Sequence, residues 1–274
     1  MRMLVEVGDR SDLALLRSIA CTHRRPRELA VALARRLAPK VLVEDLGAVR
    51  VTLGGRPLER NLRRKVLGLL CFLVSRHQLA ATRDEALEAL WPDLAPDAGA
   101  NSLHQTIYFL RRVFEPDFKE GLGAGYISFD GEVVSLSPDF IDASSRRCWR
   151  LLSEGRRLGI DYASELMSGY SGRFAQDFAY EEWAVDYRDH LHAAVLAAVE
   201  ASINEALAQG VPERAIDLAQ RVLTVDSTAD TVELALLKAY KASRRHAAAA
   251  EQYAHYASQM REQLGIEAPP IEEL

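Results

Sequence analysis

Residues 97–114 read DAGANSLHQTIYFLRRVF, and their apolar members recur with the period of an α-helix. At 3.6 residues per turn, one stripe of this helix is apolar. The stripe is formed by Ala100, Leu103, Ile107, Leu110 and Phe114. The opposite face carries Asn101, His104, Gln105, Tyr108, Arg111 and Arg112. The pattern predicts an amphipathic helix whose apolar stripe packs on a core and whose polar face is free to contact something else.

The polar face has the chemistry of a DNA-reading helix. Asn and Gln side chains can form two hydrogen bonds with the edge of adenine, and Arg can do the same with guanine. In a helix-turn-helix motif, such a helix follows a shorter helix and a turn. A polar outer face is also what any solvated surface helix has, so this stretch alone leaves both interpretations open.

The residues before this stretch supply the shorter helix and the turn. Thr82 and Glu85 have the spacing of a capping box and predict a helix over Arg83–Trp91, which Pro92 ends. A longer helix is predicted over Leu62–His77. Four cations cluster at its start, although cations at a helix N-terminus oppose the helix dipole. They are Arg60, Arg63, Arg64 and Lys65, and phosphate contact and a salt-bridged surface explain them equally well.

Short strands are predicted on both sides of the three helices. Residues 41–43, 49–53 and 56–58 alternate around Gly54-Gly55, which is typical of a small antiparallel sheet. Residues 126–129 and 132–136 flank Asp130-Gly131 and predict a hairpin with a type I′ turn. A hairpin directly after the third helix is a wing. Residues 41–140 are therefore interpreted as a winged helix-turn-helix domain.

The flanking regions are predicted to be helical. Residues 1–40 contain two helical stretches, 13–20 and 27–37, with nine Lys and Arg against four Asp and Glu. They are interpreted as an arm packed on the next domain or as the remnant of a domain upstream. Residues 141–274 predict helices over 145–152, 162–168 and 181–208. The fold class expected for the chain is mainly α with small β-sheets.

The end of the chain shows an internal repeat. Ala215 and Ala219 correspond to Ala249 and Tyr253, 34 residues later, which is the period of a tetratricopeptide repeat. Stacked helix pairs of this kind form a groove that usually holds a peptide or another protein. Alternatively, the array packs its groove against the winged helix.

Charge, apolar runs and cysteine spacing argue against a generally basic DNA-coating protein, a membrane protein and a disulfide-bonded secreted protein. The net charge is −5, and residues 41–140 hold 11 Lys and Arg against 14 Asp and Glu, so DNA binding would depend on a local basic patch. No signal peptide or membrane-length apolar run is evident. The cysteines Cys21, Cys71 and Cys148 are far apart, which favours reduced thiols and a cytoplasmic protein.

No enzyme, cofactor or metal site is predicted. No Walker loop, dinucleotide fingerprint or nucleophile elbow occurs. His190 and His192, at i and i+2, point to different faces of a helix, so they are interpreted as surface or groove residues. Tyr180, Trp183 and Tyr187 are interpreted as core residues.

Residues 41–274 resemble the antibiotic-regulatory type of bacterial transcriptional activator, which joins an OmpR-like winged helix to a helical transcriptional activation domain. Matching segments in the first half are 43–47 (VEDLG), 64–67 (RKVL), 90–93 (LWPD), 101–103 (NSL) and 110–112 (LRR). In the second half they are 170–174 (YSGRF), 180–183 (YEEW) with Arg188, and 264–269 (LGIEAP). The resemblance implies a DNA-binding activator that contacts RNA polymerase, and a homodimer is expected. The wing departs from the pattern, since residues 126–136 contain no Arg or Lys.

Three hypotheses follow. The chain is a sequence-specific transcription regulator, whose winged helix binds double-stranded DNA and whose repeats contact RNA polymerase or a second protomer. Alternatively, it is an interaction module whose winged helix has lost DNA binding and whose repeats bind a protein or a small effector. A third hypothesis, compatible with the first, makes it the output end of a larger signalling protein. The regulator hypothesis assigns base reading to the six polar residues of 97–114 and phosphate contact to the four cations of 60–65.

Overall fold

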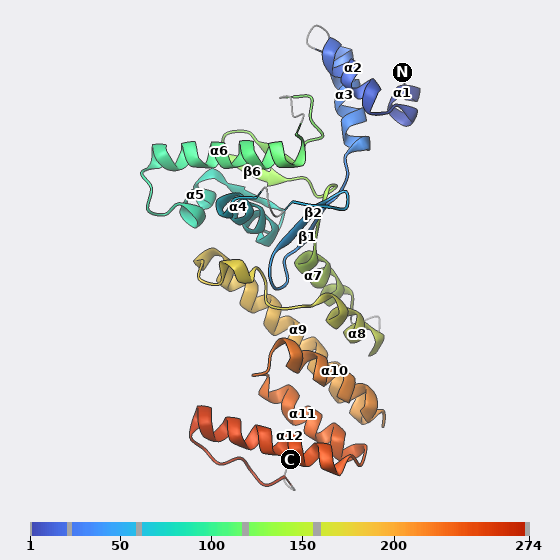
Figure 1. Ribbon diagram of the computed structural model, residues 1–274, viewed down its shortest axis with the longest axis vertical. Coiled ribbons are helices and arrows are strands. Elements are labelled where there is room, and N and C mark those ends of the chain that lie inside the picture. Colours follow the sequence, from blue (N-terminus) through green and yellow to red (C-terminus); the bar gives the residue numbers. More distant parts are fainter. Residues whose placement is uncertain (1, 21–23, 59–61, 117–120, 156–159, 272–274) are drawn as a thin grey trace. The chain divides into compact units, whose positions relative to one another are not determined.

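The computed structural model describes residues 2–20, 24–58, 62–116, 121–155 and 160–271 (Figure 1). The chain forms two compact units. The first contains Met1–Arg146 together with Asp177–Tyr187, and the second contains Arg147–Gln176 together with Arg188–Leu274. Both are built mainly from helices, and the sheets lie in the first unit, as the sequence predicts.

A four-stranded sheet opens the winged helix of the first unit. Its strands are ordered β3-β2-β1-β7, with bounds β1 Val41–Glu44, β2 Arg50–Leu53, β3 Arg56–Pro57 and β7 Ile141–Ala143. β1 pairs antiparallel with β2 and parallel with β7. Val41 and Val43 point into the core, and Leu42 and Glu44 face solvent, which is the alternation of a half-buried strand. The sequence does not predict β7.

Three helices follow this sheet and pack on one another: α4 Arg64–Ser75, α5 Arg83–Leu90 and α6 Pro96–Phe114. The predicted capping box is confirmed. The hydroxyl of Thr82 accepts a hydrogen bond from the Glu85 amide at 3.2 Å, and the Glu85 carboxylate accepts one from the Thr82 amide at 2.7 Å. The second of these bonds, followed by one from the Thr82 hydroxyl, lowers the pKa of Glu85. This cap fixes where α5 begins.

The wing is part of a three-stranded sheet in the order β4-β6-β5, formed by β4 Ala80–Thr82, β5 Ile127–Phe129 and β6 Val133–Leu136. The hairpin is confirmed, but the type I′ turn is wrong. That turn needs positive φ at both central residues, and only Gly131 has it, at 103°. The Asp130 carboxylate instead accepts hydrogen bonds from the amides of Val133 and Glu132, which closes a longer loop.

Three helices precede the winged helix: α1 Arg2–Val7, α2 Arg10–Ile19 and α3 Arg24–Leu37. Their arginines bind the segment that leads into the wing. Arg17 donates to the carbonyl of Leu122 at 3.2 Å, and Arg35 donates to that of Ala124 at 3.2 Å. Arg35 also forms an ion pair with Asp139 at 2.7 Å. Part of the positive charge of residues 1–40 therefore forms hydrogen bonds and an ion pair within the first unit.

Residues 177–187 complete the core of the first unit. The Asp177 carboxylate accepts a hydrogen bond from the Val49 amide at 2.6 Å. Trp183 lies edge-on to Phe72 of α4, with ring centroids 5.8 Å apart. The structure confirms an inward position for Trp183, which is partly buried, but Tyr180 is fully exposed and its assignment to the core is wrong. Tyr180 lies in the loop before α9 rather than on the helix, so helical spacing does not apply to it.

The second unit is a succession of helices. They are α7 Ser144–Glu154 from Arg147 on, α8 Ile160–Gly169, α9 Glu182–Ala208 from Arg188 on, α10 Pro212–Val225, α11 Asp230–Ala242, α12 His246–Gln259 and η4 Met260–Leu264. The short η3 Gln176–Phe178 lies at the boundary, and the first residues of α9 belong to the first unit. The starts and ends of α10 and α12 lie 34 residues apart, the interval seen in the sequence. Helices α10 and α11 pack together, as do α11 and α12, and the small residues Ala215, Ala219 and Ala249 are buried.

Helix α9 is long and apolar enough to cross a membrane, judged by length and composition alone. In the structure, its residues Leu191, Val195, Val199 and Ile203 are completely buried in the second unit. They recur every four residues and form one inner stripe, which is the pattern of a core helix.

We expect Thr82→Ala to lower the free energy of unfolding of the first unit by about 1 kcal/mol, because it removes the side-chain cap of α5. Urea unfolding would measure this. The matched control is Ser102→Ala, whose hydroxyl donates only to the carbonyl of Ala98 within α6. Equal effects of the two substitutions would contradict a capping role for Thr82.

Candidate nucleic-acid interface

The outer face of α6 is open to solvent. Asn101, His104, Gln105, Tyr108 and Arg112 are all exposed, and Tyr108 keeps 53% of its surface. On the inner side, Leu103, Ile107, Leu110 and Phe114 are buried, as the periodicity predicts. The helix thus anchors one stripe in the core and presents amide, aromatic and cationic groups on the other.

One flank of this face meets the wing. The ring of His104 lies edge-on to Phe129 of β5, with centroids 5.2 Å apart. About two turns further along, Arg111 donates from Nε to the carbonyl of Ile127 at 3.4 Å, and its side chain is partly buried. Arg111 therefore joins the helix to the wing, while Arg112 beside it remains exposed.

The other flank meets the start of α4. The guanidinium of Arg63 lies 4.9 Å from the ring centroid of Phe109, and Phe109 itself is 38% exposed. Arg63 occupies the N-cap position of α4, with no side-chain capping bond. A cation stacked on an aromatic ring keeps its charge and its outward N–H groups. The structure thus places one cation of the 60–65 cluster beside the polar face of α6.

The other cations of this cluster point elsewhere. Arg64 donates to the carbonyl of Asp177 at 2.9 Å and forms an ion pair with Glu181 at 3.2 Å. Lys65 donates to the carbonyl of Leu90 at the end of α5. Arg60 lies outside the described residues. Adjacent helix positions are rotated by about 100°, so neighbours in the sequence need not share a surface.

The wing tip is acidic. Asp130 and Glu132 are exposed, and hydrogen bonds from the amides of Val133 and Glu132 lower the pKa of Asp130. The Asp130 carboxylate is therefore ionised at neutral pH. Arg83 directly follows β4, the strand that pairs with β6 of the wing. It forms an ion pair with its neighbour Asp84 at 3.2 Å. An anionic wing tip repels phosphate, so it does not add to the positive patch at α6.

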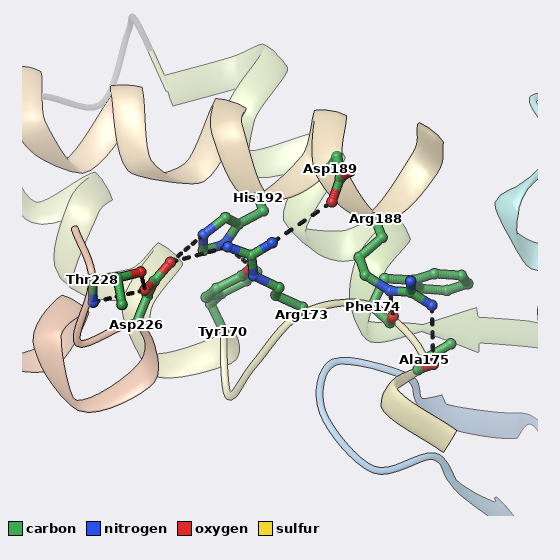
Figure 2. Close-up of polar contacts among 9 residues, drawn as sticks. All are labelled: Tyr170, Arg173, Phe174, Ala175, Arg188, Asp189, His192, Asp226 and Thr228. Atoms are coloured by element: carbon green, nitrogen blue, oxygen red, sulfur yellow. Dashed lines mark hydrogen bonds and ion pairs between the residues drawn. The ribbon is translucent and has the colours of Figure 1, made fainter. Parts of the chain in front are cut away.

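A second polar cluster lies inside the helical unit, and the sequence does not predict it (Figure 2). His192 of α9 is buried, so its assignment to the surface or a groove is wrong. Its Nδ1 atom lies 2.7 Å from the hydroxyl of Tyr170, and its Nε2 atom lies 2.7 Å from the carboxylate of Asp226. Asp226 also accepts hydrogen bonds from Arg173 at 3.2 Å and from the hydroxyl of Thr228 at 2.6 Å. His190 is exposed, as predicted.

The two arginines of this region have different roles. Arg188 is buried and donates from Nε to the carbonyl of Phe174 at 2.8 Å (Figure 2). Its burial lowers the pKa of Arg188. Arg173 is exposed and lies 3.7 Å from Asp189 as well as within reach of Asp226. Together they fix the segment between α8 and α9 and its contact with the turn after α10, which is a structural arrangement. Among the described residues, no cluster of three or more potential metal ligands occurs.

Comparison with known proteins agrees with this architecture. Residues 141–272 match the family described as the bacterial transcriptional activator domain. Mycobacterium tuberculosis EmbR, solved in complex with a low-affinity phosphopeptide, has a similar fold, with a TM-score of 0.63 and 18% sequence identity. The alignment covers 86% of this chain and 63% of the EmbR chain, so this chain spans less than two thirds of EmbR. A search of curated proteins gave no match.

The family match covers the helical half of the chain, and the winged helix precedes it in the order that the sequence resemblance implies. Residues 141–272 therefore match the bacterial transcriptional activator domain, and the winged helix-turn-helix that precedes them belongs to a fold similar to that of EmbR.

Proposed function

We propose that this chain binds double-stranded DNA in a sequence-specific manner through α6 and activates transcription through its helical repeats. The observation that carries the proposal is the exposed stripe on α6. Asn101, Gln105, Tyr108 and Arg112 follow one another at i, i+4, i+7 and i+11 on the helix that occupies the reading position of the winged helix. Such a stripe fits the major groove, which admits one α-helix.

The charge distribution supports a local contact with phosphate. The first unit carries both signs, and its wing tip is acidic, so its overall field does not attract DNA. Arg63 and Arg112 are exposed on or beside the reading face and can reach phosphates on its borders. With so few cations per protomer, a homodimer on tandem sites would supply the affinity that one copy lacks, because each protomer adds its own phosphate contacts.

The helical repeats are proposed to contact RNA polymerase or a second protomer. Support comes from the match of residues 141–272 to an activator domain and from the stacked pairs of helices α10 to α12, an arrangement that commonly presents a protein-binding surface. We expect the full chain to increase transcription from a promoter that carries its binding site. Single-round transcription with purified RNA polymerase would measure this, and reduced transcription would indicate repression instead.

Arg63→Ala tests the phosphate contact. We expect it to weaken binding to specific and random duplexes alike and to reduce the slope of log affinity against log salt by about one, because one counterion fewer is released. Fluorescence anisotropy over a salt series would measure both. The matched control is Arg221→Ala on α10, an exposed arginine paired with Asp217 in the helical unit.

An unchanged slope for Arg63→Ala would remove Arg63 from the interface. Weak binding of the wild-type chain to every duplex, with no sequence preference, would reject the whole proposal. That second outcome would favour the interaction module, for which the acidic wing tip at Asp130 and Glu132 is the supporting observation.

A further inference from the structure

The reading face of α6 is chemically uneven along its length. Its first turn exposes Asp97, the next turns carry the two amides Asn101 and Gln105, followed by Tyr108, and cations come only in the last turn. In helix-turn-helix proteins, the N-terminal residues of the recognition helix contact the base edges. The amides therefore lie where bases are read, and the arginines lie towards the end of the helix.

The arginines are further restricted by their surroundings. Arg111 donates to the carbonyl of Ile127 in the wing, which directs it away from the centre of the reading face. Arg112 is exposed, but it lies eleven residues beyond Asn101, about 16 Å along the helix axis at 1.5 Å per residue. The group that most often reads guanine is thus absent from the part of the face that Asn101 and Gln105 occupy, as far as the described residues show.

The spacing of the amides matches the spacing of base pairs. Asn101 and Gln105 are four residues apart, which is about 6 Å along the helix axis. Two base-pair steps of about 3.4 Å span nearly the same distance. Tyr108 follows Gln105 by about 4.5 Å, close to one further step. In a helix lying along the groove, Asn101 and Gln105 would therefore face two base pairs separated by one pair. Tyr108 would face the pair next to that of Gln105.

Each of the three side chains suits an A·T pair. A side-chain amide can form two hydrogen bonds with adenine: its NH₂ group donates to N7, and its carbonyl oxygen accepts from the N6 amino group. The ring of Tyr108, 53% exposed, offers an apolar surface to the 5-methyl group of thymine. Neither amide has a hydrogen-bond partner among the described residues, so each is available to a base.

The flanks hold this face in place. His104 is packed against Phe129 on the wing side, and Phe109 lies under the guanidinium of Arg63 on the side of α4. The hydroxyl of Ser102 donates to the carbonyl of Ala98 at 2.9 Å and so remains within the helix. The reading surface is thereby confined to the narrow stripe between these contacts.

We propose that the half-site read by one protomer contains two A·T pairs separated by one base pair, contacted by Asn101 and Gln105, with a thymine next to the second pair against Tyr108. This inference rests on the proposed function. In this arrangement the amides determine the base preference, and the cations at the border of the face supply affinity for DNA through phosphate contacts.

The test is selection from a duplex library with a randomised core by the full-length chain, followed by atom-level changes in the selected site. Replacing either adenine by 7-deazaadenine removes the N7 acceptor, and we expect a loss of about tenfold in affinity. Replacing the thymine by uracil removes only the methyl group, and we expect a smaller loss. In Gln105→Ala, 7-deazaadenine at the Gln105 position should have no further effect, whereas at the Asn101 position it should keep its full effect.

Ser102→Ala is the matched control on the same helix, and it should respond to each modified base as the wild-type chain does. Selection of duplexes without adenines at this spacing, or equal responses of Gln105→Ala and wild type to 7-deazaadenine at the Gln105 position, would overturn the inference while leaving DNA binding intact. Enrichment of no duplex at all would overturn the proposed function and the inference together.

Discussion

Phe72→Ala should lower the free energy of unfolding of the first unit by about 3–5 kcal/mol, the range for removing a buried aromatic side chain and leaving a cavity. Phe72 is 1% exposed in the middle of α4. Its ring meets the edge of Trp183, with centroids 5.8 Å apart, and the guanidinium of Arg76 lies 4.3 Å from its centroid. Collapse around an alanine would have to move both, so the cavity would remain largely unfilled.

Urea unfolding followed by tryptophan fluorescence would measure the effect, since Trp183 reports directly on this contact. Phe109→Ala is the matched control. Phe109 is 38% exposed on α6 and contacts Arg63 and Tyr108 at the surface, so its removal should cost well under 1 kcal/mol. Similar losses for both variants would mean that Phe72 and Trp183 are not the centre of the core of this unit.

Helix α6 could be predicted from the sequence because its signals are local. The period of Leu103, Ile107 and Leu110 identifies the buried stripe within a few turns, and Pro96 begins α6 one residue before the predicted start. The capping box at Thr82 and Glu85 is equally local, since both partners lie within four residues. These features depend on neighbours along the chain, which the sequence displays directly.

The missed elements depend on distant partners. Strand β7 has only three residues and exists because Ile141 pairs with Val41, one hundred positions earlier. Strand β4 is equally short and is defined by its pairing with β6. No periodicity can develop over three residues, so pairing across the fold decides their conformation.

The candidate site shows the same division. The exposed amides of α6 follow from helical periodicity, whereas the directions of the cations do not. Arg63, Arg64 and Lys65 are consecutive, yet they contact Phe109, Glu181 and Leu90. Glu181 lies more than a hundred residues further along the chain. The charges could be counted from the sequence, but their partners could be found only in the structure.

The burial of His192 could not be predicted either, because it also depends on residues distant in the sequence. Its partners Tyr170 and Asp226 lie 22 and 34 residues away. The spacing of His190 and His192 correctly separates the two residues onto different faces of α9, but it does not indicate which face is covered. Tyr170 and Asp226 carry no local signal of the contact, because each is an ordinary residue at the end of a helix.

We expect Asp226→Ala to lower the free energy of unfolding of the helical unit by about 3 kcal/mol, because it leaves a buried histidine and an arginine without their anion. The Asp226 carboxylate is 12% exposed and accepts hydrogen bonds from His192, Arg173 and Thr228 (Figure 2). In the tautomer that satisfies both ring nitrogens, Tyr170 donates to Nδ1 of His192, and Nε2–H donates to Asp226. Removal of the carboxylate therefore takes away the acceptor of the hydrogen bonds from His192, Arg173 and Thr228 at once.

The loss should depend on pH in a defined direction. Burial alone would raise the pKa of Asp226, but the hydrogen bonds from Thr228, His192 and Arg173 outweigh it and hold that pKa well below its usual value of 3.8. A carboxyl with a depressed pKa in the folded state stabilises the protein fully above its unfolded pKa and loses this contribution as the pH falls. The wild-type and Asp226→Ala stabilities should thus differ fully at neutral pH, start to converge as the pH falls below about 4, and continue to converge towards the depressed pKa of the folded state.

Chemical unfolding of both proteins at neutral and acid pH would measure this convergence. Asp217→Ala, on the same helix, is the matched control: Asp217 is 53% exposed and pairs only at the surface with Arg221, so its loss should cost under about 0.5 kcal/mol at either pH. An Asp226→Ala loss as small as that of Asp217→Ala, or a loss that stays constant into acid, would show that the carboxylate is not what joins the turn after α10 to His192. The contact of Tyr170 with His192 would then have to hold this region without it.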